Sequence, residues 1–295
     1  MDKAMEYKDL FTDTPTKRIH SIACGHGDHP LHFLHANGFC AGVYLPFLAH
    51  FQKDCRMIAT DIPGHGDSDH HGYARIEHWN IFVDDVKEAL VRHMSPPVIG
   101  VGHSLGAVVT LLTAAQYPEL FSHIVLIDPV IFTRSRLALV YLLKKAGLIH
   151  RIPLAQGARR RKREFTSKEE AYRRFSSGRG LFASWPHTFI KAYCQHGLSG
   201  MDQGSARLKC DPETEAQIYE SILMDIWDYP GKITCPTLVI RGEDSTTFTD
   251  SACRRLCSKI SGAKSVSIKH AGHFVAMEKA GECHNHILNF IHNYP

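Results

Sequence analysis

The sequence lacks any hydrophobic run long enough to cross a bilayer. Its longest largely apolar stretches, such as 107–115 and 124–127, are much shorter than the roughly 20 residues that a transmembrane helix needs. The first residues, Met1-Asp2-Lys3, begin no apolar signal segment. The nine cysteines are odd in number and contain no CxxC pair, so the sequence does not indicate a disulfide framework. We therefore expect a soluble protein in a reducing, cytoplasmic setting.

An excess of charge of one sign is also missing. The chain carries 34 Lys and Arg against 30 Asp and Glu, a net charge of +4, which gives no electrostatic reason to expect a nucleic-acid or membrane partner. No internal repeat is present. The 295 residues, 44% of them hydrophobic, are enough for one large domain with an insertion, which fits better than two independent domains. The sequence contains no signal for an oligomeric state.

Short apolar runs alternate with amphipathic stretches along most of the chain. We expect strands near residues 18–24, 30–34, 56–60, 97–102, 123–127, 236–241 and 264–269. Helices are expected near residues 41–53, 76–94, 105–116, 251–260 and 281–292. The turn Gly-His-Gly-Asp at 25–28 favours a hairpin between the first two strands. This alternation predicts an α/β protein with a mostly parallel, twisted sheet of about eight strands, covered by helices on both faces.

The alternation stops between about residues 132 and 228. Helical-looking segments rich in Arg, Lys and aromatic residues replace it there, without clear strand signals. The strand pattern resumes at 236–240. We therefore expect residues 1–131 and 229–295 to form the α/β core, with 132–228 as an inserted helical subdomain.

A serine stands at a predicted strand-to-helix turn. Residues 97–101 have the pattern of a buried strand and Leu105 begins an apolar helix, so Ser104 lies between them in the turn GHSLG at 102–106. The two glycines remove side chains where such a tight turn crowds its neighbours. A chance G-x-S-x-G in a loop is the alternative, and the strand-turn-helix context disfavours it. Ser104 is therefore our candidate nucleophile.

A serine hydroxyl reacts at neutral pH only when a base lies within hydrogen-bond reach. The chain has 21 histidines, so position must decide which of them serves. His273 lies in AGHFV at 271–275, in the last loop after a predicted strand and before the C-terminal helix. We expect His273 to be the base.

Such a nucleophile also needs hydrogen-bond donors for the oxyanion that its attack creates. The main-chain N–H of Leu105, at the start of the helix, is one expected donor. The loop HANGF at 35–39 follows the second predicted strand, and by its position we choose the main-chain N–H of Asn37 as the other. The Asn37 side chain could instead shape the turn.

Four motifs in this order resemble those of the α/β-hydrolase superfamily. They are HANGF (35–39), DIPGHGDS (61–68), GHSLG (102–106) and GHF (272–274). They are similar to the superfamily's HG-x oxyanion loop, D-x-x-G-x-G-x-S turn, nucleophile elbow and histidine loop, except that Ala36 replaces the usual glycine. The triad order of this superfamily, in which the histidine comes last, supports Ser104 and His273.

The resemblance implies that the insertion at 132–228 is a helical lid over Ser104. Aromatic side chains of such a lid and of the loops beside the triad would form an apolar acyl pocket. The side chains that we expect to line this pocket are Phe39, His103, Phe182, Trp185, Phe189 and Phe274. The expected partner is therefore a small-molecule acyl substrate.

Two aspartates compete for the third place in the triad. The superfamily's commonest acid position, three residues after a glycine in G-x-x-D, is occupied by Ser245, and Asp244 stands one residue early. Some members place the acid after the preceding strand, where Asp128 ends the apolar run 123–127. That position is at the sheet edge where active sites of such folds lie, although Asp128 could also cap the turn before Pro129. We favour Asp128, with Asp244 as the alternative acid.

Other charged clusters have simpler interpretations. Two groups combine histidine with aspartate, without a ligand spacing that would indicate a metal: His26, Asp28 and His29, and Asp67, Asp69, His70 and His71. We expect neither a metal nor a cofactor. The basic run at 159–163 is most simply a solvated helix face of the lid. Its alternatives are attraction of an anionic substrate, such as a phosphate-bearing or CoA-linked acyl group, and a localisation signal.

These features predict a serine hydrolase that cleaves a carboxylic ester or thioester through a Ser-His-Asp triad and an acyl-enzyme intermediate. The same machinery serves lactone and carbon–carbon bond hydrolysis, which stay open. Haloalkane dehalogenases and epoxide hydrolases are disfavoured because they place an aspartate at the Ser104 position. A non-catalytic binding protein of the same fold is the alternative from another class, but such proteins usually lack a triad residue, whereas Ser104 and His273 are both present.

Overall fold

The computed structural model of the chain describes residues 5–15, 17–70 and 75–294. The strands are β1 (Tyr7–Asp13), β2 (Arg18–Cys24), β3 (His29–Leu34), β4 (Cys55–Thr60), β5 (Val98–His103), β6 (Phe121–Ile127), β7 (Glu164–Phe165), β8 (Leu198–Gly200), β9 (Ala206–Leu208), β10 (Thr237–Gly242) and β11 (Lys264–Ile268). The α-helices are α1 (Leu45–Leu48), α2 (Val83–His93), α3 (Leu105–Gln116), α4 (Arg134–Lys145), α5 (Pro153–Arg159), α6 (Lys168–Phe175), α7 (His187–His196), α8 (Pro212–Glu220), α9 (Asp250–Lys259), α10 (Val275–Glu278) and α11 (Ala280–Asn293). The 3-10 helices are η1 (Ala41–Tyr44), η2 (Ala49–Phe51), η3 (Trp79–Phe82), η4 (Pro118–Leu120), η5 (Ile149–Arg151), η6 (Gly180–Phe182), η7 (Asp202–Gly204), η8 (Ile226–Asp228) and η9 (Pro230–Lys232).

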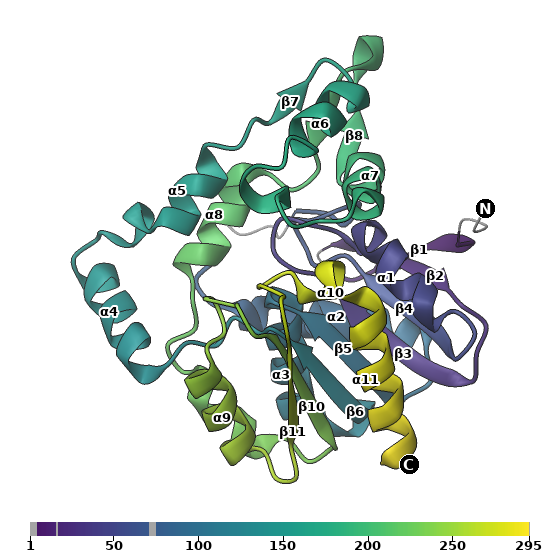
Figure 1. Cartoon of the computed structure of the whole chain (residues 1–295), viewed down its shortest axis with the longest axis vertical. Coiled ribbons are helices and arrows are strands. Elements are labelled where there is room, and N and C mark those ends of the chain that lie inside the picture. Colours follow the sequence, from purple (N-terminus) through teal and green to yellow (C-terminus); the bar gives the residue numbers. More distant parts are fainter. Residues whose placement is uncertain (1–4, 16, 71–74, 295) are drawn as a thin grey trace.

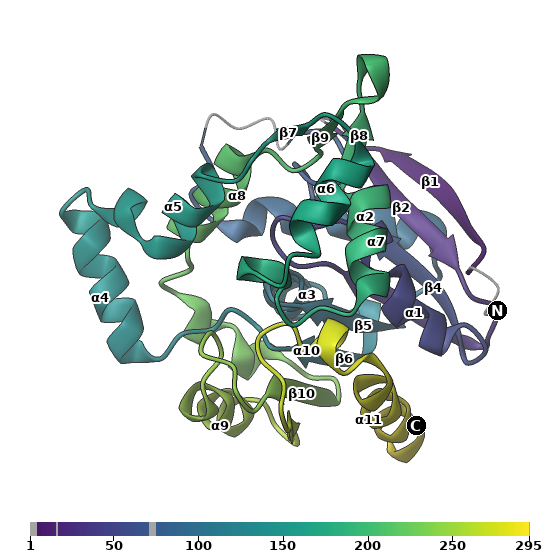
Figure 2. The ribbon, with the colours of Figure 1, turned by 45° about the horizontal axis from the view of Figure 1, so that its top comes forward.

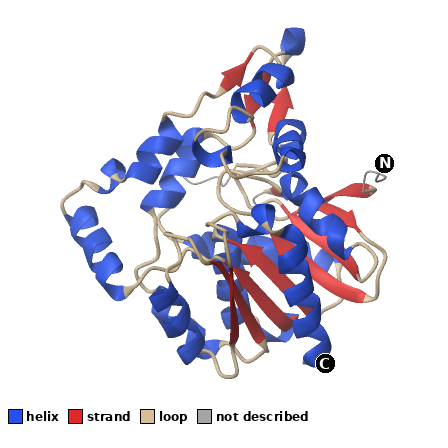
Figure 3. Ribbon diagram, viewed as in Figure 1, coloured by secondary structure: helices blue, strands red, loops and turns tan. Residues whose placement is uncertain are grey.

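Eight strands form one sheet in the order β1-β2-β4-β3-β5-β6-β10-β11 (Figures 1 and 3). The six strands from β4 to β11 are mutually parallel, whereas β2 runs antiparallel to both of its neighbours. The expected α/β class with a mostly parallel sheet of about eight strands is therefore confirmed. The edge strand β1 had no counterpart among the predicted strands.

The hairpin predicted at residues 25–28 is wrong. β2 and β3 do not pair with each other, because β4 lies between them in the sheet. The main-chain N–H groups of His26 and His29 donate to the carbonyls of Gln52 and Asp54, just before β4. The turn is thus held by the segment that leads into β4, a partner that local turn composition cannot reveal.

The buried strands divide their side chains between two apolar layers. Along β6 and β10 successive residues alternate faces, as a period of two requires: Val125, Ile127 and Ile240 join one core cluster, whereas Leu126 and Val239 join the other. Helices α2, α3 and α9 contribute to the second layer, and α1 and α11 to the first. Figure 1 shows α11 and α9 on either side of the sheet. Both faces are covered, which is why these strands read as continuous apolar runs.

Local signals define several helix ends. Ser167 caps α6 by accepting a hydrogen bond from the Glu170 N–H (3.1 Å), and Thr249 caps α9 by accepting one from the Ala252 N–H (3.3 Å).

In the part of the chain that the structure describes, no helix is both long and apolar enough to cross a membrane.

The segment 132–228 follows β6 and forms a separate group of elements from α4 to α8 (Figure 1). Figure 2, with the top turned forward, shows α6 and α7 in front of the main sheet. The insertion is mainly helical, as expected, but β7, β9 and β8 also form a small antiparallel sheet within it, which the sequence analysis did not predict. These strands have two or three residues each, too few to produce a recognisable alternation in the sequence.

The two-layer core predicts very different costs for two Phe→Ala substitutions in strands. Phe33 on β3 is fully buried and packs against Tyr44 and Phe47, so Phe33→Ala should lower the free energy of unfolding by about 3–5 kcal/mol. Phe11 on the edge strand β1 is 40% exposed, and Phe11→Ala should cost about 1 kcal/mol or less. Urea unfolding measures both values. Equal losses would contradict this description of the core.

Candidate active site

Ser104 occupies a sharp turn between β5 and α3. Its backbone has φ 56° and ψ −113°, a region that residues other than glycine adopt only at a cost. A Cβ atom at Gly102 would clash with the backbone of Gly106, and one at Gly106 would clash with the backbone of Leu34 on β3. The two glycines therefore let β3, β5 and α3 approach closely enough to form the turn.

Three of the predicted side chains meet at the carboxyl ends of the parallel strands. The Ser104 hydroxyl lies 2.9 Å from His273 Nε2, and His273 Nδ1 lies 2.7 Å from Asp128 Oδ1. An ionised carboxylate only accepts hydrogen bonds, so Nδ1 carries the proton and Nε2 is free to accept the serine O–H. Asp128 is fully buried, Ser104 is nearly so, and one-fifth of the His273 side chain is exposed.

Asp128 has two further hydrogen-bond donors. The hydroxyl of Ser245 donates to Oδ1 (2.7 Å) and the main-chain N–H of Gly242 donates to Oδ2 (3.0 Å). Ser245 is the residue that occupies the commoner acid position, and here it supports the carboxylate of the neighbouring strand. Asp244 is exposed, and the structure does not bring its side chain to His273.

The loop after β3 is held from two sides. His65 Nε2 donates to Asn37 Oδ1 (3.1 Å), and Asn37 Nδ2 donates to the carbonyl of Glu215 on α8 (3.0 Å). The Asn37 side chain therefore joins the core to the inserted segment. Leu105 is the first residue of α3, so its main-chain N–H has no acceptor within the helix.

A buried hydrogen-bonded chain that sequence reasoning missed runs beside Ser104. The Tyr44 hydroxyl lies 2.6 Å from His103 Nδ1 and accepts from the Ala36 N–H (3.2 Å), while His103 Nε2 lies 2.8 Å from the His273 carbonyl oxygen. Burial lowers the pKa of His103 to about 3. His103 was expected to line the pocket, whereas no pattern around Tyr44 pointed to this contact.

Aromatic rings gather over the loops that carry these groups. The Trp185 ring packs against Phe39 (5.2 Å between centroids) and Phe274 (5.4 Å), and Phe182 packs against Trp185 (5.1 Å). Phe39 belongs to the loop after β3 and Phe274 follows His273. The inserted segment thus contacts both loops through Trp185.

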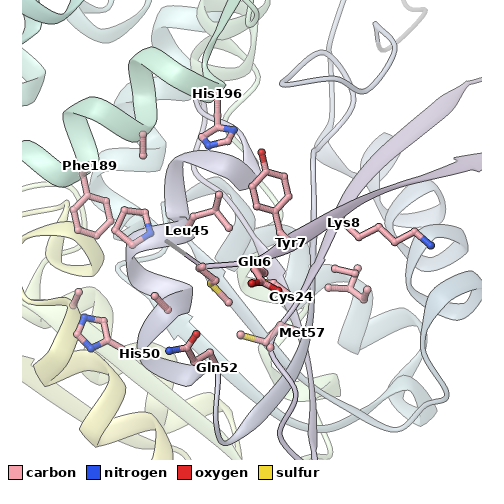
Figure 4. Close-up of a pocket in the computed structure, with 18 of the residues that line it drawn as sticks. Glu6, Tyr7, Lys8, Cys24, Leu45, His50, Gln52, Met57, Phe189 and His196 are labelled. Carbon is pink, nitrogen blue, oxygen red and sulfur yellow. The ribbon is translucent and has the colours of Figure 1, made fainter. Parts of the chain in front are cut away.

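Phe189 also lines a groove elsewhere on the molecule. This groove, of about 1590 Å³, lies between the β1–β2 edge, α1 and α7, and Tyr7, Leu45 and His196 are among its walls (Figure 4). Ser104 is not among its lining residues, so the groove is separate from the catalytic constellation.

Comparison with known proteins agrees with this fold. A model of the alpha/beta hydrolase family matches residues 26–284. The chain belongs to this family. This hydrolase is 26% identical over 247 residues to a 2-(acetamidomethylene)succinate hydrolase of Mesorhizobium japonicum, covering 82% of the chain and 81% of the relative.

Solved structures resemble this hydrolase over nearly the whole chain. A crystal structure of an E-2-(acetamidomethylene)succinate hydrolase has a TM-score of 0.79 at 23% identity, covering 97% of this chain and 99% of that one. A thioesterase domain from the curacin biosynthetic pathway has a TM-score of 0.75 at 18% identity, with 96% and 99% covered. At these identities the likeness establishes the fold.

The basic run at 159–163 is exposed except at Arg161, as a solvated run would be, but it is not a helix face. Helix α5 ends at Arg159, and the run continues toward β7. Four of its five cations form ion pairs within the inserted segment: Arg159 with Glu213 and Glu220, Arg161 with Glu215, Lys162 with Glu170, and Arg163 with Asp211. The partners lie far along the sequence, which is why the run alone suggested free charges.

Arg161 is the most deeply placed of these cations. Its guanidinium contacts the carboxylate of Glu215 and the hydroxyl of Tyr193. Burial by itself would lower the pKa of Arg161, but the Glu215 carboxylate together with the neighbouring Tyr193 and Cys210 outweighs it, and the net shift is upward. Because the main-chain carbonyl of Glu215 also accepts the hydrogen bond from the Asn37 side chain, this pair supports the loop after β3.

Neither of the two His/Asp clusters from the sequence forms a compact set of ligands among the described residues, and His71 lies outside them. Potential ligand atoms of His20, Asp61 and Asp67 do lie within 4.8 Å of one another. His20 Nδ1 is 2.7 Å from Asp61 Oδ2, and the Asp67 N–H donates to the same oxygen (2.9 Å). These contacts join β2 to the 61–68 turn.

Neighbouring arginines of the run should differ in their effect on stability. Arg161→Ala removes a cation that is 84% buried and leaves the Glu215 carboxylate, 6% exposed, without its partner, so it should lower the free energy of unfolding by about 3 kcal/mol or more. Arg160 is exposed, with no ion pair among the described residues, and Arg160→Ala should change stability by about 0.5 kcal/mol or less. Chemical denaturation compares them. A nearly silent Arg161→Ala would rule out a structural role for the pair.

Proposed function

We propose that this hydrolase cleaves a carboxylic ester or thioester with Ser104 as nucleophile, His273 as general base and Asp128 as the acid of the triad. The observation that carries the proposal is the unbroken hydrogen-bonded chain from Ser104 Oγ through both nitrogens of His273 to Asp128. Its direction, worked out from the ionised carboxylate, is the one that proton removal from the serine requires.

In the acylation step, Ser104 Oγ attacks the carbonyl carbon of the substrate while His273 Nε2 takes the hydroxyl proton. The resulting imidazolium is stabilised by Asp128, which three hydrogen bonds, from His273, Ser245 and Gly242, hold in place. The main-chain N–H groups of Asn37 and Leu105 hold the oxyanion. His273 then protonates the leaving alcohol or thiol, which departs from the acyl-enzyme.

In the deacylation step, water replaces the leaving group. His273 takes a proton from the water, whose oxygen attacks the acyl carbonyl, and the tetrahedral adduct collapses to a carboxylic acid as His273 returns the proton to Ser104 Oγ. Every proton transfer uses Nε2, so the Nδ1 hydrogen bond to Asp128 keeps one tautomer in place throughout.

We propose that residues 132–228 act as a lid over Ser104, with 1–131 and 229–295 as the catalytic core. Trp185 packs on Phe39 and Phe274 beside the triad, and Ser104 is only 4% exposed. In this proposal the lid shifts at these aromatic contacts to admit an acyl group to the serine. Its mainly aromatic inner wall favours an apolar acyl group.

Two Asp→Asn variants test the proposed acid. Asp128→Asn removes the carboxylate that fixes the His273 tautomer, so kcat for p-nitrophenyl ester hydrolysis should fall by about 10³- to 10⁴-fold with the fold intact. Asp244→Asn changes an exposed side chain and should keep kcat within about threefold of wild type.

Ser104→Ala gives the lowest kcat expected in this comparison, about 10⁴-fold or more below that of the wild type. Circular dichroism of all three variants controls for folding. A large loss in Asp244→Asn together with a nearly silent Asp128→Asn would reassign the acid. Wild-type turnover in Ser104→Ala would overturn the proposed function itself.

A further inference from the structure

We propose that Tyr44 and His103 form a positioning unit, which fixes the places of the oxyanion loop (35–39) and of the base His273 relative to Ser104. This inference rests on the proposed function and deepens it, because it assigns a role to two residues that do not react. Tyr44 closes η1, and His103 is the last residue of β5.

Three hydrogen bonds with one consistent direction define the unit. The His273 carbonyl can only accept, so His103 Nε2 carries the proton and donates to it (2.8 Å). Neutral His103 then has an acceptor at Nδ1, to which the Tyr44 hydroxyl donates (2.6 Å). The Tyr44 oxygen in turn accepts the Ala36 N–H (3.2 Å). Reversing any one of these bonds would leave another polar group unpaired.

Each end of the unit touches a residue of the proposed machinery or its immediate neighbour. Ala36 precedes Asn37, His103 precedes Ser104, and the accepting carbonyl belongs to His273 itself. The unit therefore connects the loops that follow β3, β5 and β11, which carry the oxyanion donor, the nucleophile and the base.

The oxyanion donor is oriented through the peptide plane between Ala36 and Asn37. In a trans peptide the Asn37 N–H points away from the Ala36 carbonyl and shares its plane. His35 Nδ1 donates to that carbonyl (2.8 Å), while Tyr44 holds the N–H of the same alanine. Both sides of Ala36 are thus fixed, and the direction of the Asn37 N–H follows.

Within the unit, the His103 ring beside the base is neutral because it is buried. The rings of His103 and His273 are 5.3 Å apart, so a charged His103 would oppose the imidazolium that forms on His273 during acylation. His103 is fully buried, and both of its nitrogens already have the partners that neutral imidazole requires. The three bonds therefore set the mutual placement of the loops, and burial of the ring keeps His103 neutral.

The experiment replaces Tyr44 with phenylalanine, which keeps the ring and removes the hydroxyl. Two buried groups, Ala36 N–H and His103 Nδ1, then lose their partner, and kcat for p-nitrophenyl butyrate should fall by about 10- to 100-fold with KM changed less than about twofold. Affinity for an alkyl trifluoromethyl ketone, which forms a tetrahedral adduct with an active serine, should fall by a similar factor. A merely structural role would not separate kcat from KM in this way.

Tyr229→Phe is the matched control. Tyr229 is also largely buried, and its hydroxyl bonds to Asn80 and Asp225 rather than to the catalytic loops. This variant should retain wild-type kcat and ketone affinity. Equal kinetic losses in the two Tyr→Phe variants would overturn the inference.

A second pair of variants keeps the test decisive if Tyr44→Phe fails to fold. His103→Gln retains an amide donor for the His273 carbonyl and an acceptor for Tyr44, and its kcat should stay within about tenfold of wild type. His103→Leu retains neither and should lose about 10²-fold or more.

The outcomes separate this inference from the function on which it rests. Suppose that the wild type hydrolyses the ester and binds the ketone. Unchanged kinetics in Tyr44→Phe, or equal kinetics in His103→Gln and His103→Leu, would then overturn the positioning unit alone. A wild type that neither hydrolyses the ester nor binds the ketone overturns the proposed function and the unit together.

Discussion

The strained backbone of Ser104 is the constraint on which the geometry of the rest of the site depends. A non-glycine residue at φ 56° and ψ −113° persists only where its surroundings over-determine it, at a cost of about 1–3 kcal/mol. Here the Ser104 N–H donates to the Ile127 carbonyl (2.9 Å), and β5 is paired on both sides by β3 and β6. The paired strands therefore supply the rigidity that points the hydroxyl out of the sheet edge.

The proposed acid illustrates how either of two adjacent parallel strands can supply a carboxylate to the same place. β6 and β10 are neighbours whose carboxyl ends lie at the same edge, so a carboxylate after either strand can reach the same histidine. Asp128 follows β6, and Ser245, in the commoner acid position after β10, donates to it. Ser245 occupies the position of the commoner acid, and its hydroxyl donates to the Asp128 carboxylate. With the aspartate on β6 instead of β10, no buried oxygen is therefore left without a partner.

The features predicted correctly are those with a local signal. Buried strands appear as apolar runs, and the turn at Ser104 has its own glycine spacing, so the sheet and the order of the motifs could be predicted. Contacts between distant residues could not: β4 separates β2 from β3, Arg161 pairs with Glu215, and Tyr44 meets His103. Spacing suggested that Asp128 could reach His273, whereas the supporting role of Ser245 required the structure.

The most direct test of the central claim is to label the wild-type protein with a fluorophosphonate and map the adduct by peptide mass spectrometry. An activated serine should take one adduct, on the peptide that contains Ser104, and prior reaction should abolish ester hydrolysis. An adduct on another residue, or undiminished hydrolysis after complete labelling of Ser104, would contradict the assignment of this serine as the nucleophile.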